Sequence, residues 1–256
     1  MTTISQQANP ARFLERVESE PDKLSIDDRL VALTFPQGAA AEQYRMLLHR
    51  LRFQKAQRGA VNEGGTVVAV TSALRGEGVT ITAANLALTA ARSGDSRVAL
   101  VDCDLRRGSA AQLFGIGARM GLSDLLAGRC EIGEAMGLSS EGRLAVIGAG
   151  KPPQEAAALL AGPRFTAMMG ALRNLFDEIY LDVPPVLATA DAGIIAHKAD
   201  GVVLVVRADL TPREQVDAAV RTLAGAAVWG VVLNGVDPAR VPAPLPVVKG
   251  RLTAGQ

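Results

Sequence analysis

A segment with two closely spaced glycines, VTSALRGEGVTIT at residues 70–82, has the residue types of a loop that holds a phosphate group. Gly76 and Gly78 allow a tight turn, and the N–H groups of such a turn point toward an anion together with the N-terminus of the following helix. In phosphate-binding loops of this kind, a lysine and then a serine or threonine follow the last glycine. Here the threonine is present as Thr80, but Val79 replaces the lysine. We therefore expect a loop that can hold a phosphate group but reacts it poorly.

Three aspartates follow apolar runs elsewhere in the chain. The segment ALVDCDLRRG contains Asp102 and Asp104, and IYLDVPP contains Asp182. Where parallel strands end beside a phosphate loop, carboxylates can bind a magnesium ion and manage an attacking hydroxyl group. Each aspartate alone is equally compatible with a turn or a helix N-cap, and Gly76 and Gly78 alone with an ordinary tight turn. The occurrence of all three segments in this order favours a magnesium and phosphate site.

Alternating strand and helix patterns predict the scaffold that would position these groups. Short apolar runs predict strands at residues 67–71, 97–101, 144–147, 179–183, 202–206 and 228–233. Helical patterns fall at residues 79–93, 164–176, 190–198 and 212–224. Such alternation is typical of a mostly parallel sheet that is covered by helices on both faces. We therefore expect an α/β fold with three α/β/α layers, and the acidic strand ends on one rim.

Composition indicates a single domain with two arms. The chain has 256 residues, of which 48% are hydrophobic, and no linker rich in proline, glycine or serine divides it. Residues 1–37 are polar and contain three prolines, so we expect a flexible N-terminal arm. The domain is expected over residues 38–237, and it opens with an amphipathic helix within 38–58. Residues 238–256 are rich in proline and predict an extended tail.

Charge, cysteine content and hydropathy exclude several classes of protein. The net charge of +1 gives no reason to expect nucleic acid as a partner, although weak binding to an acidic membrane stays open. Cys103 and Cys130 lack the spacing of metal ligands and are expected to be reduced thiols. No apolar run approaches the roughly 20 residues of a membrane span, and the N-terminus lacks a secretory signal. We therefore expect a soluble cytoplasmic protein with no direct membrane span.

A family resemblance covers residues 42–237, most of the chain. In order and spacing, the segments SALRGEGVT, ALVDCDLRRG, YLDVPP, ADGVVLVVR and GVVLNGVD resemble the bacterial tyrosine kinases of capsule and exopolysaccharide assembly. These are the CpsD, CapB and Wzc cytoplasmic-domain type, within the MinD/ParA-like class of P-loop proteins. The resemblance implies ATP or ADP with Mg²⁺ as cofactor and tyrosine phosphorylation as the activity. It also implies a homo-oligomer and a transmembrane polysaccharide co-polymerase, or chain-length regulator, as partners, with recruitment to the inner face of the plasma membrane.

The resemblance also assigns roles to residues of this sequence. Asp102 and Asp104 correspond to the catalytic aspartates. The metal ligands it implies are Thr80, Asp102 and Asp182, the last being the Walker B aspartate. The nucleotide-binding set it implies is Gly76, Glu77, Gly78, Val79, Thr80, Ile81 and Asn234, with Asn234 near the adenine.

Two further correspondences lie outside the nucleotide site. Arg106 matches an arginine that follows the aspartate pair in the family. Glu42 and Arg45 match the family's oligomerisation helix, in which Leu48 stands where a second arginine is expected.

The departures from the family pattern concern the phosphate-binding side chains and the tyrosines that accept phosphate. Val79 replaces the lysine, Ile81 replaces a polar residue that faces the α-phosphate, and no tyrosine cluster ends the chain, whose only tyrosines are Tyr44 and Tyr180. Loss of one charge-assisted contact weakens binding by roughly 1.5–3 kcal/mol. Loss of a preorganised charge from a transition state costs about 3–4 kcal/mol, or about 100- to 1000-fold in rate. We therefore expect nucleotide binding that is weak or absent, and little phosphoryl transfer.

These observations support two main functional hypotheses. The first is a pseudokinase of exopolysaccharide or capsule biosynthesis and export, acting as a regulatory or scaffolding partner of the membrane co-polymerase. The alternative is an active Mg-ATP-dependent tyrosine kinase or ATPase that uses a substitute cation, for which Arg75 and Lys151 are the candidates. A third, a MinD/ParA-like positioning ATPase, is disfavoured because the tail is not a basic amphipathic helix.

Overall fold

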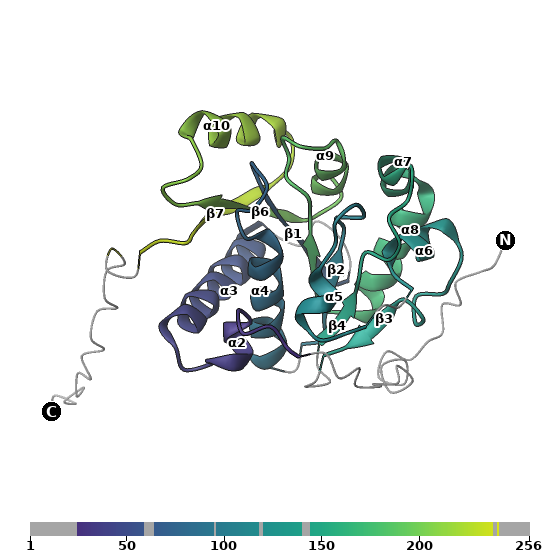
Figure 1. Cartoon of the computed structure of the whole chain (residues 1–256), viewed down its shortest axis with the longest axis horizontal. Helices are drawn as coiled ribbons and strands as arrows, with labels where there is room; N and C mark the ends of the chain where they lie inside the picture. The colour runs from purple at the N-terminus through teal and green to yellow at the C-terminus, as the bar shows by residue number, and fades with distance from the viewer. Residues whose placement is uncertain are drawn as a thin grey trace, which may run out of the picture.

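The computed structural model describes residues 25–58, 64–94, 96–117, 120–139, 144–237 and 240. A seven-stranded sheet runs through its centre in the order β3-β4-β2-β5-β1-β6-β7, with helices on both faces (Figure 1). The strands are β1 (Thr66–Ser72), β2 (Val98–Asp102), β3 (Met136–Leu138), β4 (Leu144–Ile147), β5 (Glu178–Asp182), β6 (Gly201–Arg207) and β7 (Val228–Asn234). All neighbouring strands are parallel except β3, which is antiparallel to β4. The expected three-layer α/β/α fold is confirmed.

Continuous burial explains why the central strands consist of uninterrupted apolar runs. Every residue of β1 and β2 is buried, as expected for parallel strands that are covered on both faces. In β1, Val70 is paired in register with Asp182 of β5, and Asp182 is also paired with Asp102 of β2. The carboxyl ends of β1, β2 and β5 therefore meet at one edge of the sheet, where the glycine loop also begins.

One face of the sheet is covered by the N-terminal helices. These are α2 (Val31–Thr34), α3 (Ala39–Arg58), α4 (Val79–Arg92) and α5 (Ala110–Leu113). Leu86 of α4 packs with Val70 and Leu100 of the sheet, and α3 lies against α4 (Figure 1). Because α4 starts directly after the glycine loop, its packing on the sheet fixes the direction in which its N-terminus points.

The other face carries the later helices. These are α6 (Leu122–Ala127), α7 (Ala156–Ala161), α8 (Pro163–Leu175), α9 (Asp191–Ala196) and α10 (Arg213–Thr222). Phe165 and Leu172 of α8 pack with Ile179 and Leu181, the alternate residues of β5. None of the helices in the described part of the chain combines the length and hydropathy needed to cross a bilayer.

Residues 25–37 differ from the expectation of a flexible arm. Leu30 is fully buried, the N–H of Asp27 donates to the carbonyl of Leu113, and the N–H of Ala32 donates to Oδ1 of Asn85. This part of the predicted arm therefore packs on the domain, because Leu30 is buried in the core and the side chain of Asn85 on α4 accepts the N–H of Ala32. Residues 1–24 of the arm, and all of the predicted tail at 238–256 except residue 240, lie outside the described residues.

Candidate functional site

The glycine loop connects β1 to α4 with two residues in the left-handed region. Gly76 has φ 81° and Gly78 has φ 92°, and Gly78 is the N-cap of α4. A Cβ atom added at Gly78 would collide with the side-chain amide of Asn234. Glycine is therefore required at this position both for its conformation and for the close approach of β7.

Glu77 and Asn234 hold the loop from behind. Glu77 is buried, and its carboxylate accepts hydrogen bonds from the N–H of Leu74 (2.8 Å) and from the hydroxyl of Thr211. The amide Nδ2 of Asn234 donates to the carbonyl of Glu77 at 2.8 Å. Glu77 and Asn234, two of the predicted nucleotide-binding residues, therefore contact the loop itself in this structure and fix its shape.

A cavity of about 320 Å³ lies in front of the loop. This volume is at the lower end of the range for small-ligand sites. We call it the loop cavity. Its lining residues are Arg29, Ser72, Arg75, Gly76, Glu77, Gly78, Val79, Thr80, Ile81, Asp104, Ser109, Leu113 and Pro185. All six predicted loop residues line it, and so does Asp104. Arg29 is a cation that the sequence patterns did not single out, because it lies in a segment without periodicity.

Thr80 and Asp182 meet at the acidic edge. The side chain of Thr80 lies beside the carboxyl group of Asp182, whose Oδ2 is buried without a hydrogen-bond partner among the described residues. Burial, reinforced by the negative charge of Asp102, raises the pKa of Asp182 well above its usual range. An orphaned carboxylate oxygen beside a threonine hydroxyl is a suitable pair of oxygen ligands for Mg²⁺. The residues present therefore fit a magnesium-bound phosphate.

Asp102 has a structural task in addition. It is fully buried, and its two carboxylate oxygens accept hydrogen bonds from the N–H groups of Asp104 (3.1 Å) and Ala110 (2.9 Å). Burial raises the pKa of Asp102 to about 7, although these backbone hydrogen bonds lower it. Asp102 therefore fixes the turn from which Asp104 reaches the loop cavity, and the two aspartates occupy different positions.

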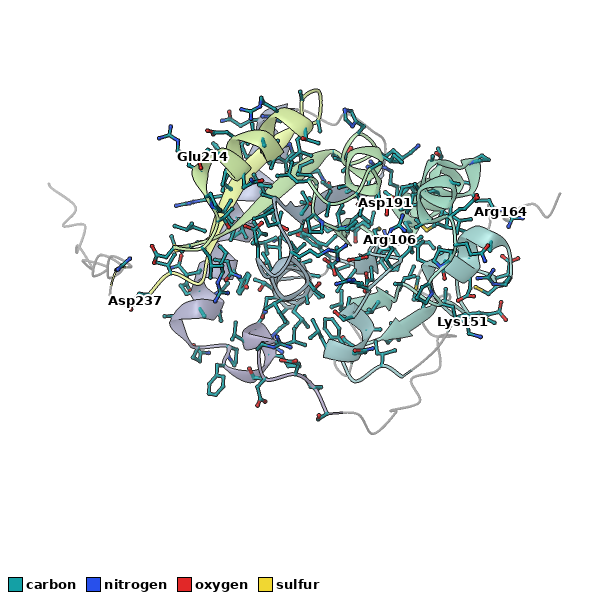
Figure 2. The ribbon with its side chains drawn as sticks, turned by 45° about the horizontal axis from the view of Figure 1, so that its top comes forward. Arg106, Lys151, Arg164, Asp191, Glu214 and Asp237 are labelled. Carbon is teal, nitrogen blue, oxygen red and sulfur yellow. The ribbon has the colours of Figure 1, made fainter. Side chains whose placement is uncertain are left out.

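Asp102 lines a second, larger cavity of about 760 Å³, together with Lys151. Lys151 is exposed and lies at the edge of the molecule in Figure 2, away from Arg106 and Asp191. Arg106 donates from Nε to Oδ2 of Asp191 at 3.3 Å. Of the two substitute cations predicted from the sequence, Arg75 lines the loop cavity and Lys151 lines the neighbouring one.

The described residues contain no group of three or more histidine, cysteine, aspartate or glutamate side chains arranged to hold a metal ion. Mg²⁺ is commonly bound through one or two carboxylates together with phosphate oxygens of the substrate. Thr80 and Asp182 would therefore need phosphate oxygens to complete the coordination, which ties metal binding to nucleotide binding.

The predicted oligomerisation residues lie on the exposed side of α3. Nε of Arg45 donates to Oε2 of Glu42 at 2.6 Å, and Nη1 of Arg45 donates to the carbonyl of Pro36. Leu48, which stands where the family has a second arginine, is buried against α4 and the sheet. In the isolated chain, Glu42 and Arg45 of α3 therefore form an ion pair with each other.

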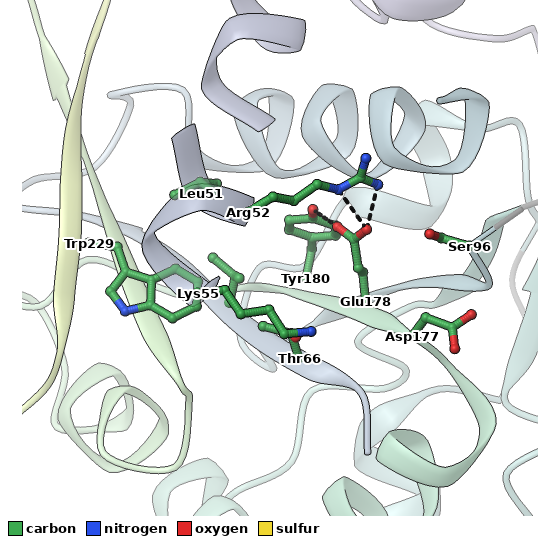
Figure 3. A pocket seen from close by; sticks show the side chains of 10 residues that line it. Leu51, Arg52, Lys55, Thr66, Ser96, Asp177, Glu178, Tyr180 and Trp229 are labelled. Atoms are coloured by element: carbon green, nitrogen blue, oxygen red, sulfur yellow. Dashed lines mark hydrogen bonds and ion pairs between the residues drawn. The ribbon is translucent and has the colours of Figure 1, made fainter. Parts of the chain in front are cut away.

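Neither tyrosine is a freely accessible phosphate acceptor. Figure 3 shows Tyr180 beside a cavity of about 240 Å³ that Thr66 and Trp229 also line, at the other end of the strands from the glycine loop. The hydroxyl of Tyr180 donates to Oε2 of Glu178 at 2.6 Å, and burial raises its pKa well above the usual range. Tyr44 is half-buried, with its hydroxyl beside the side chain of Thr82, and burial raises its pKa.

Comparison with known proteins identifies relatives along most of the chain, although no family model matches it. The tyrosine-protein kinase YwqD of Bacillus subtilis is 33% identical over 208 residues, which cover 80% of this chain and 85% of that protein. The tyrosine-protein kinase CpsD of Streptococcus agalactiae is 34% identical and covers 67% of this chain and 75% of its own. The chain spans only 27% of the putative tyrosine-protein kinase EpsB of Ralstonia solanacearum, with 35% identity over 82% of this chain.

Solved structures agree with these relatives. The kinase domain of Escherichia coli tyrosine kinase ETK superposes with a TM-score of 0.76 and 29% identity, over 84% of this chain and 83% of that one. The chimerical protein CapA2B2 gives a TM-score of 0.74 and 27% identity, over 86% and 97% of the two chains. The cell division ATPase MinD of Pyrococcus furiosus shares the fold alone, with a TM-score of 0.56 and 23% identity. Because the match to YwqD covers most of both chains, this protein belongs to the family of bacterial tyrosine-protein kinases.

Proposed function

We propose that this chain is a pseudokinase of bacterial exopolysaccharide or capsule biosynthesis and export. It binds a magnesium nucleotide weakly, transfers the phosphoryl group slowly or not at all, and regulates or scaffolds a membrane polysaccharide co-polymerase. The observation that carries the proposal is Val79, a hydrocarbon side chain at the first position of α4, where the phosphate loop pattern requires lysine.

The remaining parts of the site support binding. The backbone N–H groups of the glycine loop and the N-terminus of the 14-residue helix α4 would hold the phosphates. Thr80 and Asp182 would hold Mg²⁺, and the nucleotide would supply the phosphoryl group for any transfer. Asp104 lines the loop cavity, where a carboxylate can accept a proton from an attacking hydroxyl group.

The missing charge limits chemistry more than binding. The helix N-terminus supplies about half an elementary charge, and unlike a lysine ammonium it cannot follow the charge that develops during transfer. Loss of one charge-assisted contact between a lysine and a phosphate weakens binding by roughly 1.5–3 kcal/mol. Loss of a preorganised charge from the transition state slows transfer by about 100- to 1000-fold. Phosphoryl transfer is therefore the property most affected by Val79.

Membership of the family supports a membrane partner. Relatives named as tyrosine-protein kinases include proteins of which this chain spans about a quarter, and others of which it spans most. We propose that the chain assembles in the cytoplasm with a transmembrane co-polymerase, at the inner face of the plasma membrane. Glu42 and Arg45, which are exposed on α3, would then exchange their mutual ion pair for contacts with a second copy.

Steady-state ATP hydrolysis, measured with Mg²⁺ on the purified full chain, tests the catalytic half of the proposal. Isothermal calorimetry of ADP and ATP tests the binding half. We expect measurable binding, and turnover no higher than that of Asp182→Asn, which removes the buried carboxylate beside Thr80. Hydrolysis at the rate of lysine-bearing relatives, lost in Asp182→Asn, would refute the pseudokinase.

The alternative is an active kinase or ATPase that uses a substitute cation. It is favoured by one specific observation, the presence of two arginines, Arg29 and Arg75, among the residues that line the loop cavity. The same hydrolysis assay, extended to tyrosine phosphorylation with labelled ATP, separates the two functions, because only the alternative requires magnesium-dependent turnover.

A further inference from the structure

Arg29 lines the loop cavity although two helices and a strand separate it from the glycine loop in the sequence. Its position is fixed by its neighbours. Leu30 is fully buried, and the N–H of Asp27 donates to the carbonyl of Leu113 at 3.0 Å. The short segment around Arg29 is therefore held on both sides and cannot drift from the cavity.

The same segment is attached to α4. Asn85 of α4 is fully buried, and its Nδ2 donates to the carbonyl of Arg29 at 2.9 Å. Its Oδ1 accepts from the N–H of Ala32 at 3.0 Å. The backbone around Arg29 is thus hydrogen-bonded to the helix whose N-terminus faces the cavity, and these bonds fix its position.

The guanidinium of Arg29 is presented in the geometry that binds oxyanions. Its Nε donates to Oδ1 of Asp27 at 2.9 Å and its Nη2 donates to Oδ2 at 2.7 Å, a two-pronged contact with one carboxylate. Arginine makes the same kind of contact with phosphate. The side chain is 67% exposed, so the contact with Asp27 can be exchanged at little cost for one with a ligand.

Arg75 is less suited to this role. It also lines the cavity, but it belongs to the exposed front of the glycine loop, next to a glycine in the left-handed region. No side-chain hydrogen bond or ion pair holds Arg75 in the described structure, whereas the backbone of Arg29 is held on α4 by Asn85. A cation whose backbone is already held near the ligand loses less conformational entropy when it binds.

We infer that Arg29 is a phosphate-binding cation of the loop cavity: it leaves Asp27 and contacts the nucleotide phosphates, and so supplies for binding part of the positive charge that Val79 removes. The inference rests on the proposed nucleotide binding. Its chemistry is recognition of a phosphate group, and Asp27 is the internal competitor that occupies Arg29 while the phosphates are absent. Substitutions of the two residues must therefore change nucleotide affinity in opposite directions.

Calorimetric titration of the full chain with MgADP, with magnesium and inorganic triphosphate, and with adenosine tests this inference. We expect Arg29→Ala to weaken MgADP and triphosphate about 10-fold each, and to leave adenosine unchanged. Arg29→Lys should recover part of the loss. Asp27→Asn, whose amide oxygen can still accept the backbone N–H of Arg29, should tighten both phosphate ligands about 2- to 3-fold. The loss in Arg29→Ala should shrink as salt is raised.

Arg213→Ala is the matched control. Arg213 is a strongly exposed arginine on α10 that also faces an aspartate close by in sequence, and its removal should change no affinity. Hydrogen exchange gives an independent readout: bound MgADP should protect the N–H of Ala32 in the wild-type chain and protect it less in Arg29→Ala. Thermal melting of each variant shows whether it is folded before it is titrated.

The outcomes are distinct. If the wild-type chain binds no nucleotide at millimolar concentration, the proposed binding fails and this inference fails with it. If the wild type binds and both Arg29→Ala and Asp27→Asn bind equally well, only the inference is overturned, because the phosphates then bind without Arg29. Should Arg29→Ala prove unstable, tighter binding by Asp27→Asn still supports the inference, and unchanged binding overturns it.

Discussion

Restoring the lysine, by Val79→Lys, is the most direct perturbation of the site. Val79 is half-buried and, as the first residue of α4, packs at the edge of the core. The lysine stem can keep part of that apolar contact. A cation at a helix N-terminus costs about 0.3–1 kcal/mol, so we expect the ligand-free variant to be less stable by roughly 1 kcal/mol.

The gains should exceed this cost once nucleotide is present. One charge-assisted contact to phosphate contributes roughly 1.5–3 kcal/mol, which corresponds to about 10- to 150-fold in MgATP affinity. A preorganised charge on the transferring group contributes about 3–4 kcal/mol to the transition state, or about 100- to 1000-fold in turnover. The expected variant therefore binds more tightly, hydrolyses ATP measurably, and melts at a higher temperature with MgADP than without.

Calorimetry and a coupled ATPase assay measure the two gains separately. Val79→Met, which adds length without charge, is the control and should give neither gain. Adding Asp182→Asn to Val79→Lys should remove the turnover, because an uncharged amide then replaces the buried carboxyl group beside Thr80. If Val79→Lys binds and hydrolyses ATP no better than Val79→Met does, the missing charge is not what limits this site, and the reasoning is refuted.

Three other predictions concern the scaffold. Burial raises the pKa of Asp182 well above its ordinary range and that of Asp102 to about 7, so between about pH 4 and pH 7 these groups bind more protons in the folded chain. Their contribution to the free energy of unfolding therefore falls as the pH rises. Urea titrations at several pH values in this range should show that the free energy of unfolding falls less steeply with pH in Asp102→Asn than in the wild type. An equal dependence on pH in the two proteins would contradict the raised pKa of Asp102. Gly78→Ala should abolish nucleotide binding and destabilise the chain by about 1–3 kcal/mol, because φ is 92° there; calorimetry and thermal melting that match the wild type would argue against it. Arg173→Ala removes the ion pair in which the guanidinium lies 2.6 Å from the carboxylate of Asp200, which is about 90% buried, so we expect the free energy of unfolding in urea to fall by about 3–5 kcal/mol; a fall below 1 kcal/mol would contradict this.

Most regular elements could be predicted from local patterns. All six strands expected from apolar runs are present, and five helices, α3, α4, α8, α9 and α10, lie where helical patterns were recognised. Among the described residues, the elements that were missed have six residues or fewer: α2, α5, α6, α7 and β3. Segments this short show no full hydrophobic period, so their structure depends on contacts with other parts of the chain.

The candidate site divides in the same way. The glycine loop, Thr80 and the aspartates were recognised from residue type and spacing, and the structure brings Asp104 and Thr80 into one cavity. The contact between Asn234 and the carbonyl of Glu77 joins residues 157 positions apart, so no local pattern could reveal that these residues shape the loop. The packing of Arg29 and its neighbours on Asn85 was missed for the same reason.

The sequence by itself therefore determined the class of fold and the absence of the lysine charge, because hydrophobic periodicity and residue identity are local properties. Only the tertiary structure decided which polar groups meet: Asp102 holds a backbone turn while Asp104 faces the cavity, and an arginine from the segment before α3 approaches the phosphate loop. The physical reason is that hydrogen bonds and charges act over a few ångströms in space. Packing of α4 and the segment around Arg29 against the sheet brings residues that are distant in the chain within that range.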